Sequence, residues 1–236
     1  MATSLGHIDT PESLSRKGTH AWSGAHAQAG RKYATELIGT FFLVFTVGAT
    51  VIIHSALAPL AIGAELMAMI YAGAHVSGGH YNPAVTVAAL VRGRIGARDA
   101  AAYGVAQLAG GLLAAAAVGS EIRHARVTAF SDHGMPTAAV AELLFTFALC
   151  YVVLNVATSR AHPDNSFYGL AIGFTVVAGA IAVGGISGAA FNPAVTLGAT
   201  ALGLFAWSTL WMYIAVQLIA GAAAGLAFRV LNPEDK

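Results

Sequence analysis

The sequence contains very little charge. Only 10% of its 236 residues are Asp, Glu, Lys or Arg, against about a quarter in an ordinary soluble domain, and 57% are hydrophobic. This composition excludes a typical soluble domain and favours a protein that lies in a lipid bilayer. The formal net charge is +1, which gives no reason to expect nucleic acid or an acidic macromolecule as a partner.

A second cysteine is missing, as are the arrangements typical of enzymes and metal sites. Cys150 is the single cysteine, so no internal disulfide can form, and we interpret it as a small packing residue. No Ser/His/Asp or His-Glu-Xaa-Xaa-His arrangement is present, and no cysteine or carboxylate stands at ligand spacing from His75 or His80. We therefore expect neither an enzyme, nor a metal ion, nor another cofactor.

What the sequence does contain is six apolar stretches, each close to the roughly 20 residues that cross a hydrocarbon core. They cover residues 33–54, 57–76, 99–120, 137–159, 167–183 and 207–230. In a bilayer the backbone must satisfy its own hydrogen bonds, which favours helices. The predicted fold class is an all-α membrane protein with six transmembrane helices.

The two ends of the chain differ from this apolar part. Residues 1–30 are rich in Ser, Thr, Gly and His and predict a flexible N-terminal tail, residues 31–230 a membrane domain, and residues 231–236 a C-terminal tail. If the N-terminus is cytoplasmic, ten of the twelve Lys and Arg residues lie inside and only Arg123 and Arg126 outside. We expect both termini in the cytoplasm and the chain in the cell (inner) membrane.

The chain contains an inverted internal repeat. Three landmarks occur in the same order in residues 33–120 and in residues 137–230, at offsets of 106, 110 and 110 residues. They are the pairs Glu36 and Glu142, Asn82 and Asn192, and Gln107 and Gln217. Three spans separate matching points, so the second copy must enter the bilayer upside down. The functional site is then expected near the midplane, where the copies meet.

Each repeat carries the tripeptide Asn-Pro-Ala, followed by an apolar stretch that is too short to cross a bilayer. The copies are Asn82-Pro83-Ala84 and Asn192-Pro193-Ala194, followed by residues 85–91 and 195–202. Asn caps free N–H groups and Pro presets the φ of the first helical residue, so both copies predict a helix start. We expect two re-entrant half-helices that enter from opposite faces and meet tip to tip.

The Gly-rich segments before these tripeptides are expected to be extended, because irregular backbone is tolerated at that depth only where it is buried or lines water. The predicted acceptors are the carbonyls of Gly78, Gly79, His80, Gly188 and Ala190. The amides of Asn82 and Asn192 would donate at the centre. Both half-helices point about half a positive charge at the midplane, which opposes cations and protons and lets neutral molecules pass.

On these residues the chain resembles the aquaporin, or major intrinsic protein, family over about residues 33–230. Residues 183–195 look closer to tonoplast intrinsic proteins and their bacterial relatives. The resemblance implies a right-handed bundle of six helices with two half-helices, assembled as a homotetramer with one pore per subunit. It also implies a passive channel for water or small uncharged solutes, in which Glu36 and Glu142 hold the loops before the half-helices through backbone N–H groups.

One departure from the family concerns its narrow outer filter, where most members carry Arg after the second Asn-Pro-Ala. The four filter positions of this chain are Ile62, Ala180, Ala189 and Val195. Four apolar residues predict a wide pore for glycerol, urea, ammonia, hydrogen peroxide or metalloid hydroxides such as arsenite, with water alongside. The alternative is a strict water channel in which Phe191, or loop groups near Arg123 and Arg126, refill the space.

Three polar residues near the predicted pore keep two interpretations each. Glu65 lies one turn from Ile62 and either touches the pore or is a protonated or loop-bonded acid. His75 and His80 either are structural or titrate near neutrality and gate conduction. For the whole protein, a secondary transporter and a non-conducting scaffold also remain alternatives, and proton-coupled uptake would favour the transporter.

Overall fold

The structure is a computed structural model that describes residues 11–121 and 134–235. Its helices are α1 (Pro11–Ile52), α2 (Ala58–Ser77), α3 (Pro83–Arg92), α4 (Ala97–Glu121), α5 (Gly134–Thr158), α6 (Tyr168–Ser187), α7 (Pro193–Ala201), the short 3₁₀ helix η1 (Trp207–Thr209) and α8 (Leu210–Leu231). Six segments, namely α1, α2, α4, α5, α6 and η1 with α8, are long and apolar enough to cross a membrane. The predicted all-α fold with six spans and two short helices is confirmed.

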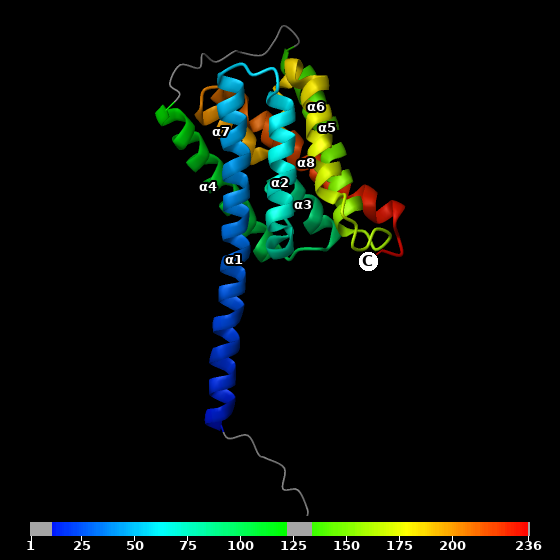
Figure 1. Ribbon diagram of the computed structural model, residues 1–236. Helices are drawn as coiled ribbons and strands as arrows, with labels where there is room; N and C mark the ends of the chain where they lie inside the picture. Colours follow the sequence, from blue (N-terminus) through cyan, green and yellow to red (C-terminus); the bar gives the residue numbers. More distant parts are fainter. Residues whose placement is uncertain (1–10, 122–133, 236) are drawn as a thin grey trace, which may run out of the picture.

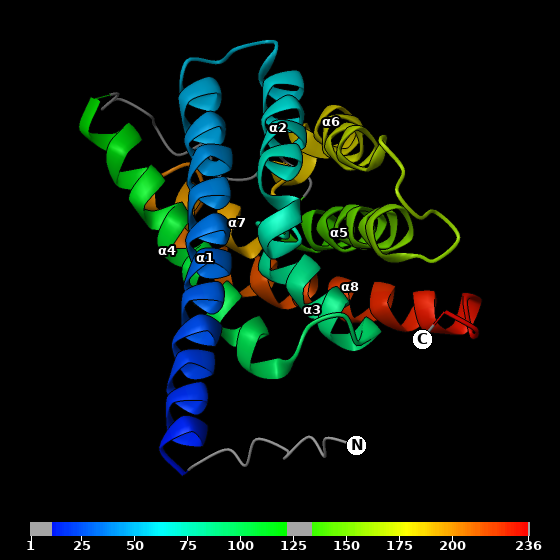
Figure 2. The ribbon, with the colours of Figure 1, turned by 60° about the horizontal axis from the view of Figure 1, so that its bottom comes forward.

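The two half-helices, α3 and α7, lie inside the bundle, α3 in the half nearer the C-terminus and α7 in the other half (Figure 1). Each packs on a long helix of the other repeat, α3 on α8 and α7 on α4 (Figure 2). The helices α2 and α6 also pair across the repeats, while α1 packs along α4 and α5 along α8. The two repeats are therefore interlocked and build one bundle.

Glycines allow the closest helix crossings. Gly63 of α2 faces Gly173 of α6, and a Cβ built on Gly63 would lie 2.5 Å from the Gly173 carbonyl oxygen. Gly110 has the same role at the crossing of α4 and α1, where its built Cβ would lie 2.5 Å from the Leu37 carbonyl oxygen. Such backbone contact between small residues holds helices together in a bilayer, where apolar burial gives little driving force.

The first helix begins earlier than the sequence predicts. It starts at Pro11, so residues 11–30, predicted as part of a flexible tail, are helical instead. Proline suits the first position of a helix because its missing N–H is not needed there. The membrane-competent part starts only at Ala27, and α1 projects beyond the bundle (Figure 1). Residues 1–10 of the predicted tail lie outside the described residues.

The C-terminal residues are fastened to the end of α3. The Arg92 side chain is 1% exposed and donates to the Asp235 carboxylate at 2.7 Å, to the Asp235 carbonyl at 2.7 Å and to the Thr158 hydroxyl at 3.1 Å. Its guanidinium also lies 4.1 Å from the centre of the Phe228 ring. The segment predicted as a C-terminal tail is therefore held against the bundle by Asp235.

We expect Asp235→Asn to lower the melting temperature by a few degrees at neutral pH. Burial by itself raises the pKa of Asp235, but hydrogen bonds from the Arg160 backbone N–H, the Arg92 guanidinium and Ser159, together with the Arg92 charge, outweigh it and lower this pKa. A lowered pKa stabilises the fold above the ordinary value of about 3.9, and this contribution is lost as the pH falls through the folded-state value.

Melting curves of the detergent-solubilised protein check this prediction. Wild type and Asp235→Asn should differ at neutral pH and converge well below the ordinary carboxyl pKa. Glu234→Gln is the matched control, because the neighbouring Glu234 side chain is exposed. A difference that persisted unchanged in acid would contradict the ionic role of Asp235.

Candidate pore

Both half-helices begin as the sequence predicts. Asn82 and Asn192 have extended backbones, with φ of −157° in each, and their side-chain oxygens accept from the backbone N–H groups of Ala84 and Ala194 at 2.8 Å. Proline follows at the start of each helix. The caps satisfy part of the free N–H groups, and each helix tip keeps its partial positive charge.

The tips of the two half-helices are hydrogen-bonded to the opposite repeat. The Asn82 amide donates to the Phe191 carbonyl at 2.9 Å, and the Asn192 amide donates to the Tyr81 carbonyl at 2.8 Å. Tyr81 and Phe191 have left-handed φ values of 48° and 50°, which strain a residue with a side chain. An amide carries two N–H groups, so each asparagine keeps one that is not used in this bond.

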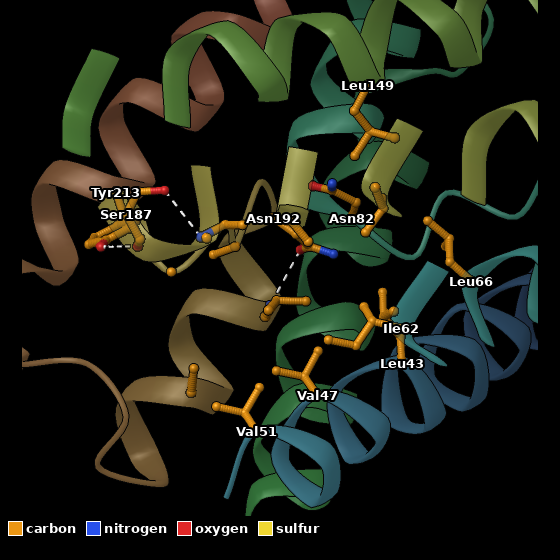
Figure 3. Close-up of a pocket in the computed structure, with 18 of the residues that line it drawn as sticks. Leu43, Val47, Val51, Ile62, Leu66, Asn82, Leu149, Ser187, Asn192 and Tyr213 are labelled. Carbon is orange, nitrogen blue, oxygen red and sulfur yellow. Dashed lines mark hydrogen bonds between the residues drawn. The ribbon is translucent and has the colours of Figure 1, made fainter. Parts of the chain in front are cut away.

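A cavity of about 660 Å³ runs past the two asparagines. Its wall includes Val153 in one half of the bundle and Val51 and Thr209 at the opposite end. Figure 3 shows Asn82 and Asn192 close together in this wall, which residues of both repeats build. The cavity therefore brings the remaining asparagine N–H groups within reach of a molecule that passes through the centre.

The four predicted filter residues all lie in the wall of this cavity. They are Ile62 of α2, Ala180 of α6, Ala189 in the segment before α7, and Val195 in the first turn of α7. None of these side chains carries a hydrogen-bond donor, so this part of the wall is apolar. Figure 3 places Ile62 beside Leu43 and Val47 of α1. That the four residues select permeants stays a prediction.

The residues predicted to offer carbonyls lie at the cavity with one exception. Gly79, His80, Gly188 and Ala190 line the wall, whereas Gly78 does not. Gly78 ends α2 in a left-handed conformation with φ of 91°, as Gly188 ends α6 with φ of 81°, so the two repeats differ here although their backbones match. A ladder formed by the other four carbonyls stays a prediction.

Each repeat holds the segment before its asparagine through one buried glutamate. The donors to Glu36 are the backbone N–H groups of His80 (3.0 Å) and Tyr81 (2.7 Å), the Ser77 hydroxyl (2.7 Å) and the Gln107 amide (2.8 Å). Glu142 has the equivalent donors of the second repeat: the backbone N–H groups of Ala190 (3.0 Å) and Phe191 (2.8 Å), the Ser187 hydroxyl (2.8 Å) and the Gln217 amide (2.8 Å). Both carboxylates are fully buried. These bonds put Glu36 and Glu142 in the supporting position that the family resemblance implies.

Glu65 and His75 are not part of the cavity wall. Glu65 is half-buried on α2, and within the described residues no hydrogen bond or ion pair reaches its carboxyl group. Within the described residues, neither contact with the cavity wall nor a bond to a loop is seen for Glu65, and its role stays a prediction. His75 is exposed on the same helix, and a gating role for it stays a prediction.

An aromatic ring does line the end of the cavity near α7, but the sequence does not predict which one. Phe191 is 1% exposed, stacks on Phe145 with ring centres 5.5 Å apart and lies outside the wall, so it does not refill the filter. Arg123 and Arg126 lie outside the described residues. Phe205, between α7 and η1, lines the cavity instead. Its place depends on the path of that loop, for which the sequence carries no signal.

Known proteins resemble this chain over most of its length. The family model described as major intrinsic protein matches residues 26–228. The chain is 39% identical to the Glycerol uptake facilitator protein-like 6 of Lactiplantibacillus plantarum over 216 residues, covering 87% of this chain and 100% of that protein. It is 35% identical to Aquaporin NIP1-3 of Oryza sativa subsp. japonica, covering 89% and 76%, and 33% identical to Aquaporin Z of Photorhabdus laumondii, covering 87% and 99%.

The fold is also similar to a solved structure. The X-ray structure of the aquaglyceroporin from Plasmodium falciparum matches with a TM-score of 0.70 and 25% identity, covering 86% of this chain and 95% of that chain. The likeness of residues 183–195 to tonoplast intrinsic proteins stays a prediction. With its six apolar helices and its match to the family model, the chain is a multi-pass membrane protein and belongs to the major intrinsic protein family, whose members are channels.

Proposed function

We propose that this protein is a passive channel for water and small neutral solutes that excludes protons and ions. The observation that supports this best is the meeting of two Asn-capped half-helix tips in the wall of one cavity. Each tip presents about half a positive charge, so a cation meets a barrier where a neutral molecule can accept a hydrogen bond from Asn82 or Asn192. The channel is a homotetramer in the cell (inner) membrane, with one pore per subunit and both termini in the cytoplasm.

The apolar filter favours solutes beyond water. Its four side chains offer neither the bulk nor the fixed donors of an arginine, so larger neutral molecules fit and water is not specially bound. Glycerol, urea, ammonia, hydrogen peroxide and undissociated arsenite are the candidates. The relative named as a glycerol uptake facilitator supports this choice, while the relative named Aquaporin Z keeps a strict water channel as the second candidate.

Flux measurements on proteoliposomes with purified wild-type protein test this proposal. Light scattering should show fast osmotic shrinkage, followed by re-swelling as glycerol or urea enters, and the flux should rise linearly with the gradient. Arsenite entry is measured in the same vesicles. Fast water flux without glycerol or urea entry would identify a strict water channel. Saturable, proton-coupled uptake would favour a transporter, and no flux of any kind a scaffold.

Val195→Arg is expected to restrict the pore to water. The guanidinium would add bulk, charge and donors to an apolar wall, so glycerol entry should fall about tenfold, which corresponds to a barrier higher by about 1.4 kcal/mol, with a smaller loss of water flux. Val195→Leu is the matched control, because it fills space without adding donors. Unchanged fluxes, or an equal loss of water and glycerol, would show that Val195 is not at the filter.

A further inference from the structure

Each repeat has a buried tyrosine that supports the end of another helix: Tyr103 of α4 supports α2, and Tyr213 of α8 supports α6. Tyr103 and Tyr213 stand 110 residues apart, are 2% and 0% exposed, and donate their hydroxyl groups to the carbonyls of Ser77 and Ser187, both at 2.6 Å. They are therefore equivalent positions of the inverted repeat. Figure 3 shows Tyr213 next to Ser187 at one end of the cavity.

A ring that lines the cavity packs on each tyrosine, and these two rings differ in chemistry. On Tyr103 it is His80, with ring centres 5.2 Å apart, beside Tyr33 at 6.0 Å; on Tyr213 it is Phe205, with ring centres 5.0 Å apart. The residue that matches His80 in the second repeat is Ala190, which has no ring. The loop after α7 thus supplies Phe205 to the place that the repeat itself leaves without one, and both rings line the cavity.

The Phe205 ring is held in place by two neighbours. It stacks on Tyr213 at an angle of 12° between the ring planes. Its second neighbour is Gly188, where a built Cβ would lie 2.5 Å from Cε1 of Phe205. Gly188 has a left-handed φ of 81°, and Ala189 of the filter follows it directly. The ring is therefore a fixed part of the wall beside the filter.

Three of the four hydroxyl groups in this end of the wall donate elsewhere, and the fourth, that of the exposed Ser208, is bonded to no residue that the structure describes. Ser187 donates to Glu142 at 2.8 Å, and Thr209 donates to the Ala206 carbonyl at 2.9 Å. The Tyr213 hydroxyl is bonded to the Ser187 carbonyl. Between these hydroxyl groups and the asparagines, a passing molecule meets the Phe205 ring and the four apolar filter side chains. It must lose hydrogen bonds with water, and only solutes with apolar surface regain free energy by contact with the ring.

Resting on the proposed function, we propose that Phe205 is a specificity-determining residue of this channel. Its ring completes an apolar constriction that favours small neutral solutes with a hydrocarbon face, such as short polyols, over solutes of similar size that are polar all round, such as urea. The inverted repeat then has two chemically different ends, with an imidazole at one tyrosine and a phenyl ring at the other.

The ratio of glycerol to urea permeability in proteoliposomes tests this role. Phe205→Ala and Phe205→His should each lower the ratio about tenfold, since loss of an apolar contact changes discrimination by roughly that factor. Phe205→Leu should keep the ratio within about twofold, because it preserves apolar surface with less volume. Trp207→Ala is the matched control, because this exposed aromatic residue lies two positions away and outside the wall.

The outcomes separate this inference from the proposed function. A wild-type channel that passes water but neither solute would remove the proposed solute function. A wild-type channel that passes glycerol, with an unchanged ratio in folded Phe205→Ala or Phe205→His, would overturn the role of Phe205 alone. Size-exclusion profiles and melting temperatures establish that the variants are folded. If the alanine variant does not fold, the histidine and leucine variants decide between these results.

Discussion

Glu142→Leu is expected to leave little or no folded channel. The carboxylate accepts four hydrogen bonds between 2.8 Å and 3.0 Å, from Ala190, Phe191, Ser187 and Gln217. Leucine accepts none, so four buried donors would lose their partner at about 1–3 kcal/mol each. Native proteins are stable by only about 5–15 kcal/mol in total, so this loss is comparable to the whole.

The loss also affects the pore directly. Phe191 has a left-handed φ of 50°, a strained conformation that persists only while its surroundings fix it. Its N–H is bonded to Glu142 and its carbonyl accepts from Asn82, so the same residue connects the glutamate to the opposite half-helix tip. Without the carboxylate, we expect Phe191 to relax and the bond across the two repeats to break.

Yield and melting temperature in detergent, followed by water flux in proteoliposomes, measure this effect. We expect the melting temperature of any folded Glu142→Leu protein to fall by more than about 10 °C, and that of Glu142→Gln by less, because an amide still accepts at one oxygen. Glu65→Leu is the matched control: it removes another glutamate from a membrane helix, one to which no hydrogen bond is seen within the described residues. Equal stability of the Glu142→Leu and Glu65→Leu variants would disprove the supporting role.

The features that the sequence predicted well are local or repeated. Asn82 followed by proline is a helix start signal by itself, and the second copy at Asn192 made the antiparallel arrangement and the meeting of the tips predictable. The equivalent positions of Glu36 and Glu142 in the two halves followed from the same repeat. In each case a short-range preference and the inverted topology indicate the same structure.

The features that the sequence did not predict lack a counterpart in the repeat. The ion pair at the C-terminus joins Arg92 to Asp235 across 143 residues, and the position that matches Arg92 in the second repeat is Leu202. Phe205 enters the wall because a loop folds over Gly188, and a loop path is set by tertiary packing. The helical extension before Ala27 was missed because its composition is that of a tail.

Gly221→Val is expected to abolish water flux while the protein still folds with moderately lower stability. The Cα of Gly221 in α8 lies against the first turn of α3, where a built Cβ would collide with the Ala84 carbonyl oxygen and lie 3.0 Å from the Ala84 carbonyl carbon. These atoms are backbone, so no side-chain rotation can relieve the contact. Overpacking of this kind costs about 1–3 kcal/mol, and the strain would fall on the tripeptide that begins at Asn82.

The inverted repeat gives a second, equivalent position at which the same effect is expected. Gly111 of α4 has the same place against α7, with a built Cβ 2.7 Å from the Ala194 carbonyl oxygen, so Gly111→Val should have the same effect from the other half. Gly104→Ala, seven residues earlier in α4, is the matched control, because its Cβ would meet nothing within 4 Å and alanine favours helix. Stopped-flow shrinkage of proteoliposomes, normalised to the amount of folded protein, measures the flux. If the two valine variants conduct water like Gly104→Ala, the half-helix tips tolerate displacement and their alignment does not control permeation.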